Sequence, residues 1–144
     1  MSEYTHVLLA SDLTEASHQV AEKAAAIAKQ HGAKLSVMHI VEPMPAYVDT
    51  GAYAGVTDIE QGLIEEAKSN CAELSLTLNV APADQHIEVG PPKYLIVKRA
   101  EELGADLIVV GSHGRHGMSW LLGSTANAVV NSAHVDVLVV RYSD

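Results

Sequence analysis

The 144-residue sequence contains one cysteine, Cys71, so an intramolecular disulfide is impossible. It has no phenylalanine, and aromatic residues make up only 4% of the chain, so the core must consist of Ala, Val, Leu and Ile. No segment approaches the roughly 18 apolar residues that a membrane-spanning helix needs. The N-terminal apolar run is also too short for a signal peptide. These absences predict a cytoplasmic protein that is not embedded in a membrane.

Basic residues are scarce, because 9 Lys and Arg stand against 18 Asp and Glu, which gives a formal net charge of −9. Such a surface repels nucleic acid and anionic membranes, and neither is expected as a partner. A small anion is a different case, because local backbone geometry can override the overall charge. Hydrophobic residues form 48% of the chain, and its length fits a single domain covering residues 1–144.

Apolar runs alternate with helical periodicities along the chain. Strand-like runs lie at residues 6–11, 35–41, 85–89, 106–110 and 137–140. Helical spacings fill the intervals at residues 16–27, 59–78, 92–103 and 124–133. This βαβαβαβαβ order predicts an α/β fold with an open, doubly wound, five-stranded parallel sheet flanked by about four helices. We expect a Rossmann-like sheet with strand order 3-2-1-4-5.

Local signals refine this prediction. Asp12 or Thr14 is suited to cap the first helix, and Gly32 lies where a C-terminal cap belongs. Residues 42–56, with two prolines and two glycines, form the one long irregular stretch, whose length is typical of a lid or a disordered segment. Residues 85–89 alternate polar and apolar, which predicts a strand at one sheet edge. The apolar strand Val137–Val140 is expected at the other edge, where it could pair with a second copy.

A glycine-rich stretch follows the fourth predicted strand. No acidic residue lies between Asp106 and Asp136, whereas this interval has Arg115 and glycines at 111, 114, 117 and 123. Glycines after a parallel strand let backbone N–H groups approach an anion, and the next helix N-terminus adds donors and partial positive charge. The hydroxyls of Ser124 and Thr125 lie beside these amides. The stretch is therefore predicted to bind the phosphates of a nucleotide.

Each of these features also has a purely structural explanation. Glycines after strands can serve only as turn residues, and Ser124 can serve only as a helix cap. His113 and His116 have metal-ligand spacing, but no cysteine or carboxylate cluster accompanies them, so no metal site is predicted. His6 and His39 lie in predicted strands and are expected to be hydrogen-bonded structural residues. Cys71 falls on a helical apolar stripe and is expected in the core.

The sequence contains no catalytic constellation. A Gly-x-Ser-x-Gly elbow, a Ser–His–Asp order and a Walker pattern ending in Gly-Lys-Ser/Thr are all missing. Nothing is placed to orient an attacking water, so any ATP hydrolysis should be slow. No cage of carboxylates is built for Mg²⁺, which would accompany the ligand only if a triphosphate is bound.

These motifs together resemble the universal stress protein family, in the subgroup that carries a nucleotide-binding loop. The family pattern is Gly-x-x-Gly, eight or nine residues, then Gly followed by Ser or Thr. Here it reads Gly111-Ser112-His113-Gly114, eight residues, then Gly123-Ser124. The segments HVLLASDLT and HIVEP resemble the family's first strand with its following Asp and its second-strand end. The resemblance spans residues 4 to 141.

The resemblance implies an ATP-binding stress-response protein that acts as a nucleotide-dependent switch or sensor, with ADP or AMP as other possible ligands. Asp12 would contact the adenosine moiety, and the backbone of Val41 would read the adenine edge. The other implied contacts are to ribose and phosphates, from Gly111, Gly114, Arg115, Gly123, Ser124 and Thr125. Arg115 would touch the outer phosphates. The family also implies a homodimer that forms through the last strand.

Other functions remain open. One alternative is a dimeric interaction protein that does not use nucleotide. Family members of that kind lack the glycine motif, whereas this chain retains it. A flavodoxin-like electron carrier would need aromatic residues around its flavin, and the sequence has few. A phosphoacceptor receiver domain is excluded, because Val89-Gly90-Pro91 supplies no acid after the third strand.

Overall fold

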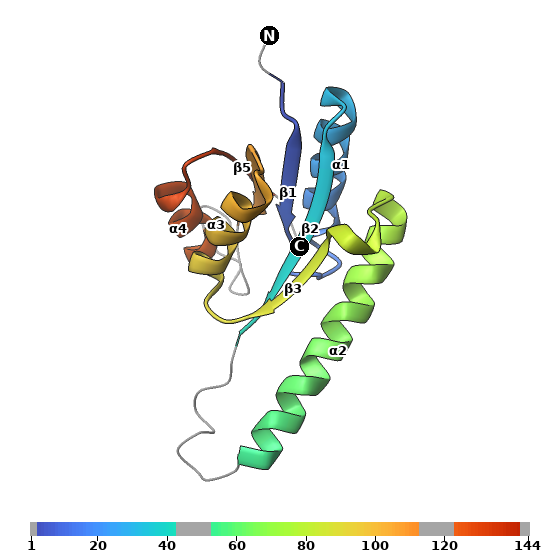
Figure 1. Ribbon diagram of the computed structural model, residues 1–144, viewed down its shortest axis with the longest axis vertical. Coiled ribbons are helices and arrows are strands. Elements are labelled where there is room, and N and C mark those ends of the chain that lie inside the picture. Colours follow the sequence, from blue (N-terminus) through green and yellow to red (C-terminus); the bar gives the residue numbers. More distant parts are fainter. Residues whose placement is uncertain (1–2, 43–52, 113–122, 142–144) are drawn as a thin grey trace.

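The computed structural model describes residues 3–42, 53–112 and 123–141 (Figure 1). Strands and helices alternate as predicted. The elements are β1 (His6–Ala10), α1 (His18–His31), β2 (Lys34–Val41), α2 (Tyr53–Leu78), β3 (Gln85–Val89), α3 (Pro92–Leu103), β4 (Leu107–Gly111), α4 (Ser124–Ser132) and β5 (Asp136–Val140). A short 3₁₀ turn, Pro82–Asp84, precedes β3. Within the described ranges, no helix is both long enough and apolar enough to cross a membrane.

The five strands form one parallel sheet in the order β3-β2-β1-β4-β5, which confirms the predicted fold class and strand order. The register places Leu9 of β1 opposite Val37 of β2 and Val109 of β4. These three side chains are fully buried because helices cover both faces of the sheet. Continuous apolar runs rather than alternating ones therefore mark the central strands.

Two apolar layers sandwich the sheet. Odd-numbered residues of β1, including Leu9, pack with α1 and α2 in one buried cluster. Even-numbered residues, including Leu8 and Ile108 of β4, pack with α3 and α4 in the other. In Figure 1, α1 and α2 accordingly lie on one side of the strands and α3 and α4 on the other. The change of side occurs between β1 and β4, where the strand order reverses.

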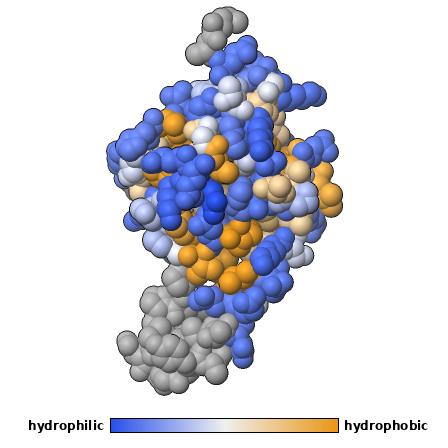
Figure 2. Space-filling view, viewed as in Figure 1, coloured by the Kyte–Doolittle hydropathy of each residue, from blue (hydrophilic) through white to orange (hydrophobic). Residues whose placement is uncertain are grey.

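The two sheet edges are β3 and β5, as the sequence predicted. Four of the five β3 residues are half-buried, and Val89 at its end is 38% exposed. Figure 2 shows hydrophobic surface gathered over the lower end of β3, whereas much of the remaining visible face is hydrophilic. Four of the five β5 residues are likewise half-buried. Each edge therefore exposes apolar surface beside its outer backbone groups.

The predicted C-terminal cap at Gly32 is confirmed, and Gly104 plays the same part in α3. Gly32 ends α1 with φ +64°, and Gly104 ends α3 with φ +69°. Each caps its helix by donating its backbone N–H to a carbonyl in the last turn. An L side chain at a φ of this sign is strained, so glycine suits both positions.

Two boundary predictions are wrong. Neither Asp12 nor Thr14 caps the first helix, because α1 begins at His18 with Ser17 as its N-cap residue. The irregular stretch does not reach residue 56, because α2 already begins at Tyr53. A single glycine inside a helix costs only about 1 kcal/mol relative to alanine, so Gly55 does not stop α2. Residues 43–52, the rest of the predicted lid, lie outside the described residues.

Candidate functional site

The predicted site residues in the described ranges lie at the carboxyl ends of β2, β1 and β4 and at the start of α4. Val41 is the last residue of β2, Asp12 follows β1, and Gly111 ends β4. β1 lies directly between β2 and β4, and helices change sides at the β1–β4 junction. Open α/β sheets bind ligands at this type of reversal point. The structure therefore brings these residues to the edge where a ligand site is expected.

The turn between β1 and α1 presents Asp12. The carboxylate Oδ1 of Asp12 accepts hydrogen bonds from the backbone N–H of Thr14 at 3.0 Å and from the Thr14 hydroxyl at 2.7 Å. Such a two-residue Asx turn fixes the orientation of the carboxylate. Asp12 is exposed to solvent. Its role inside the turn is thus to hold the backbone of Thr14, while its side chain remains at the molecular surface.

Leu13 gives this turn an unusual backbone. Its φ is +61°, in the left-handed region that costs a non-glycine residue roughly 1–2 kcal/mol. The Leu13 N–H donates to the Ser11 hydroxyl at 3.0 Å, and Ser17 donates its hydroxyl to the Thr14 carbonyl at 2.7 Å. Side-chain hydrogen bonds therefore hold the turn in a conformation that its sequence would not otherwise favour.

Val41, the last residue of β2, is buried beneath the surface of this edge. Its side chain is buried, with 6% exposed, and its carbonyl oxygen accepts the backbone N–H of Gly90 at 3.0 Å. A carbonyl oxygen has two lone pairs, so one acceptor position remains after this bond. The pairing shows that the Val41 backbone groups point toward β3, away from Asp12.

The two ends of the glycine-rich stretch lie next to each other. The backbone N–H of Gly123 donates to the Ser112 carbonyl at 2.6 Å, and the Ser112 N–H donates to the Val140 carbonyl at 2.9 Å. The chain thus leaves β4 at Ser112 and returns at Gly123 within hydrogen-bonding distance. The intervening residues 113–122 include the predicted site residues Gly114 and Arg115, which lie outside the described residues.

The start of α4 supplies backbone donors next to this junction. Gly123 has φ −63° and ψ 159°, and no side chain of the described residues caps the helix. The first intrahelical bond runs from the Asn127 N–H to the Gly123 carbonyl, so the N–H groups of Ser124 and Thr125 precede the helical ladder. Because Gly123 uses its own N–H internally, Ser124 and Thr125 are the residues whose amides and hydroxyls can meet an anion.

Among the described residues, the groups whose pKa is shifted lie away from this edge. Burial and the nearby Arg99 guanidinium lower the pKa of His86, on β3. Partial burial alone would raise the pKa of Asp106. Hydrogen bonds from the backbone N–H groups of His6 and Thr5 outweigh that effect, so the pKa lies below its usual value. Asp106 joins the amino ends of β1 and β4, since its carboxylate accepts the Thr5 N–H, next to β1, at 2.9 Å. It is a structural residue.

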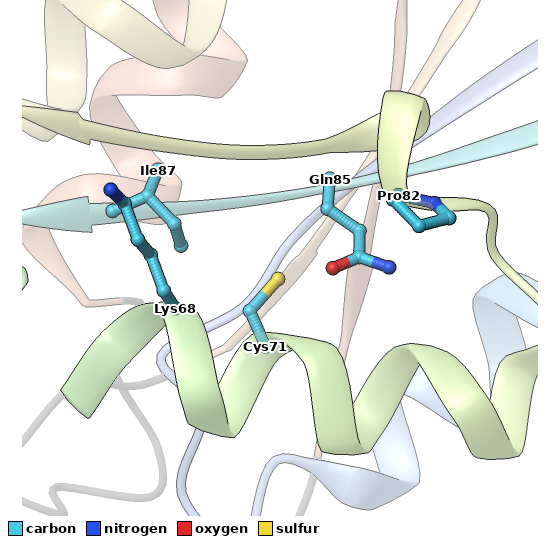
Figure 3. Close-up of a pocket in the computed structure, with 5 residues that line it drawn as sticks. All are labelled: Lys68, Cys71, Pro82, Gln85 and Ile87. Carbon is cyan, nitrogen blue, oxygen red and sulfur yellow. The ribbon is translucent and has the colours of Figure 1, made fainter. Parts of the chain in front are cut away.

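A cavity of about 310 Å³ also lies away from the carboxyl edge, between α2 and the start of β3. Its lining is Lys68, Cys71, Pro82, Gln85 and Ile87 (Figure 3). Burial raises the pKa of the Cys71 thiol, which disfavours the nucleophilic thiolate. Cys71 is 1% exposed, which confirms its prediction as a core residue. In the described part of the chain, no group of three potential metal ligands comes together, and His113 and His116 lie outside it.

Two residues gain importance that the sequence did not reveal. Thr14 orients the Asp12 carboxylate, and the Asp-x-Thr spacing of an Asx turn was an available signal for it. His39, predicted only as a satisfied strand residue, places its Nδ1 2.8 Å from the Ser11 carbonyl. No sequence pattern identifies that partner, which lies 28 residues earlier in the chain.

Comparison with known proteins gives a consistent result. Residues 3–141 match the model of the universal stress protein family. The chain is 42% identical over 142 residues to universal stress protein A homolog 2 of Coxiella burnetii, covering 98% of this chain and 97% of the relative. The solved structure of universal stress protein UspA from Lactobacillus plantarum matches with a TM-score of 0.81 and 25% identity, over 98% of this chain and 100% of that one.

A further solved structure is that of a universal stress protein in complex with cAMP. It matches with a TM-score of 0.66 and 27% identity, and the match covers 97% of this chain and 98% of that protein.

Proposed function

The chain belongs to the universal stress protein family, and we propose that it binds an adenine nucleotide at the carboxyl edge of its sheet, as a nucleotide-dependent switch or sensor in the stress response. ATP is the leading ligand, with ADP and AMP as alternatives. The relative solved with cAMP supports an adenine nucleotide as the ligand class.

One observation carries this proposal: the order of the residues along the edge follows the order of groups in the nucleotide. Val41 ends β2, Asp12 follows β1, Gly111 ends β4, and Ser124 begins α4. Neighbouring strands lie about 4.8 Å apart, so β2 and β4 are roughly 10 Å apart across β1. In this arrangement adenine lies near Val41, the ribose near Asp12, and the phosphates between Gly111 and α4.

The polar groups at this edge fit each end of the ligand. An exposed carboxylate that is already oriented, as in Asp12, accepts hydrogen bonds from ribose hydroxyls without further ordering. The backbone amides of Ser124 and Thr125, at a helix N-terminus without a side-chain cap among the described residues, suit phosphate oxygens. Gly114 and Arg115 complete the proposed set from the sequence motif, with Arg115 on the outer phosphates.

The described residues supply binding groups rather than reaction groups. Carboxylate, amide and hydroxyl groups at this edge hold and orient a nucleotide, and none of them is an activated base. We therefore propose that turnover is slow or absent and that the bound and free states carry the signal. Mg²⁺ would enter with a triphosphate, held by its oxygens rather than by a protein cage.

Direct titration tests the function. The purified protein should release heat on titration with ATP and should gain thermal stability in the presence of millimolar ATP, ADP or AMP, because a ligand that binds only the folded state stabilises it. cAMP belongs in the same series because of the solved relative. Absence of heat and of stabilisation with all four nucleotides would favour the alternative function, a dimeric interaction protein without a nucleotide.

We also propose that the protein forms a homodimer through β5. The Val140 carbonyl accepts the Ser112 N–H, so the backbone groups of Val139, one residue earlier, point away from β4 toward the open edge. Light scattering at micromolar concentration should give twice the 15.3 kDa of one chain. Val139→Pro removes an outward N–H and should yield monomers that stay folded. A monomeric wild-type protein would contradict the proposal.

A further inference from the structure

His39 is joined to the turn that carries Asp12. Its ring Nδ1 lies 2.8 Å from the carbonyl oxygen of Ser11. A carbonyl oxygen only accepts, so Nδ1 bears the hydrogen and donates it. The ring is half-buried, and Ser11 is the residue immediately before Asp12. The contact therefore acts on the backbone at the point where β1 turns toward the site.

This contact stands where the backbone ladder between β1 and β2 ends. The Ser11 N–H still donates to the Met38 carbonyl at 2.9 Å, which is the last main-chain bond of the pair. In a continuing parallel ladder the amide of Ile40 would reach the Ser11 carbonyl. Here the His39 ring supplies a donor to that carbonyl, and the chain is free to turn at Asp12. The side chain thus replaces a ladder bond at the strand end.

We propose that His39 is a positioning residue of the nucleotide site: its Nδ1–H, donated to the Ser11 carbonyl, holds the turn that presents the Asp12 carboxylate. The inference rests on the proposed function, because it assigns Asp12 to the nucleoside. It also joins two parts of the site, since β2 carries both His39 and, two residues later, Val41. A shift of β2 at the adenine position would reach Asp12 through this bond.

The turn needs such support. Leu13, one residue after Asp12, has the positive φ of +61°, and its N–H depends on the Ser11 hydroxyl for a partner. If the Ser11 carbonyl is released, the Ser11–Asp12 peptide group can rotate, and the next peptide group, whose Leu13 N–H bonds the Ser11 hydroxyl, can move with it. The positive φ of Leu13 then relaxes and the Asx turn of Asp12 loosens. The contacts that are lost should therefore be those to the nucleoside end of the ligand rather than those to the phosphates.

The test compares three variants by calorimetric titration with AMP, ADP and ATP. His39→Leu removes the donor and should lower the affinity for all three nucleotides by the same factor. That factor is roughly three- to tenfold, which corresponds to the loss of one neutral hydrogen bond. His39→Asn keeps an N–H near the position of Nδ1 and should restore affinity to within about twofold of wild type. An equal loss for the three nucleotides is the signature of an effect at the nucleoside.

His6→Leu is the matched control. His6 is also a strand histidine with hydrogen-bonded ring nitrogens, but it lies at the amino end of the sheet. Its Nδ1 is 3.2 Å from the Leu103 carbonyl and its Nε2 is 2.7 Å from the Ser36 hydroxyl. Its replacement should lower stability without changing nucleotide affinity. If His39→Leu behaves in the same way as His6→Leu, His39 is merely structural and the inference is overturned.

Amide hydrogen exchange provides a readout that does not depend on nucleotide. In His39→Leu the amides of Leu13 and Thr14 should exchange faster, while those of the central strands keep their protection. Unchanged exchange at these two amides overturns the inference even if the fold is intact. Failure of the wild-type protein to bind any adenine nucleotide overturns the proposed function, and with it the role of His39. Wild-type binding that persists unchanged in His39→Leu overturns the role of His39 alone.

Discussion

Replacement of Ser124 by proline should weaken ATP binding roughly 100-fold or more while the fold remains intact. Proline removes the backbone N–H and the hydroxyl at the first position of α4, two donors that would each form a charge-assisted bond of about 1.5–3 kcal/mol with a phosphate. The first helical position tolerates proline, because its N–H has no acceptor within the helix. Gly123, with ψ 159°, already has the extended conformation that proline imposes on the preceding residue.

The control is Ser124→Ala, which removes the hydroxyl and keeps the amide. It should lose about tenfold in ATP affinity, and urea denaturation of both variants should give unfolding free energies within about 1 kcal/mol of wild type. Adenosine, which carries no phosphate, should bind all three proteins equally. If Ser124→Pro binds ATP as tightly as wild type does, the start of α4 is not the phosphate site.

The sequence was sufficient to predict the fold because the main signals were local and repeated. Continuous apolar runs marked the covered strands β1 and β4, and the alternation in residues 85–89 marked the edge strand β3. The alternation of strands and helices restricted the strand order, since right-handed crossovers leave few arrangements, and the prediction that residues 85–89 and 137–140 form the two edges agreed with the order 3-2-1-4-5. The position of Asp12, Val41 and Gly111 at one edge then follows, because parallel strands end on the same side.

Contacts between distant residues could not be predicted in the same way. The Ser11–Asp12–Leu13 segment looked like the start of a helix because polar residues that cap helices also form turns. Only the structure shows that α1 begins later and that Leu13 has a positive φ. The bond between His39 and Ser11 depends on the register of β1 against β2, which the composition of neither strand reveals.

The largest effect on stability is expected at the centre of the sheet. Leu9→Ala should lower the free energy of unfolding by about 2–5 kcal/mol, as measured by urea denaturation. Leu9 is fully buried on β1, between β2 and β4, and packs against the face that α1 and α2 cover. The neighbouring strands are held in the sheet, so they cannot readily move into the space that the side chain vacates. A loss of this size is a large part of the 5–15 kcal/mol typical of a domain.

Leu76→Ala is the matched control, because the same atoms are removed from a side chain that is 81% exposed. It should change the free energy of unfolding by no more than about 0.5 kcal/mol. Leu9 lies two residues before Ser11 but does not itself reach the carboxyl edge, so the folded Leu9→Ala protein should keep its nucleotide affinity. A concentration of ATP 100 times its dissociation constant should then raise the free energy of unfolding of both the wild type and the variant by about 2.7 kcal/mol. A smaller gain in the variant would mean that packing under β1 also shapes the turn that carries Asp12, and that core and site are not independent.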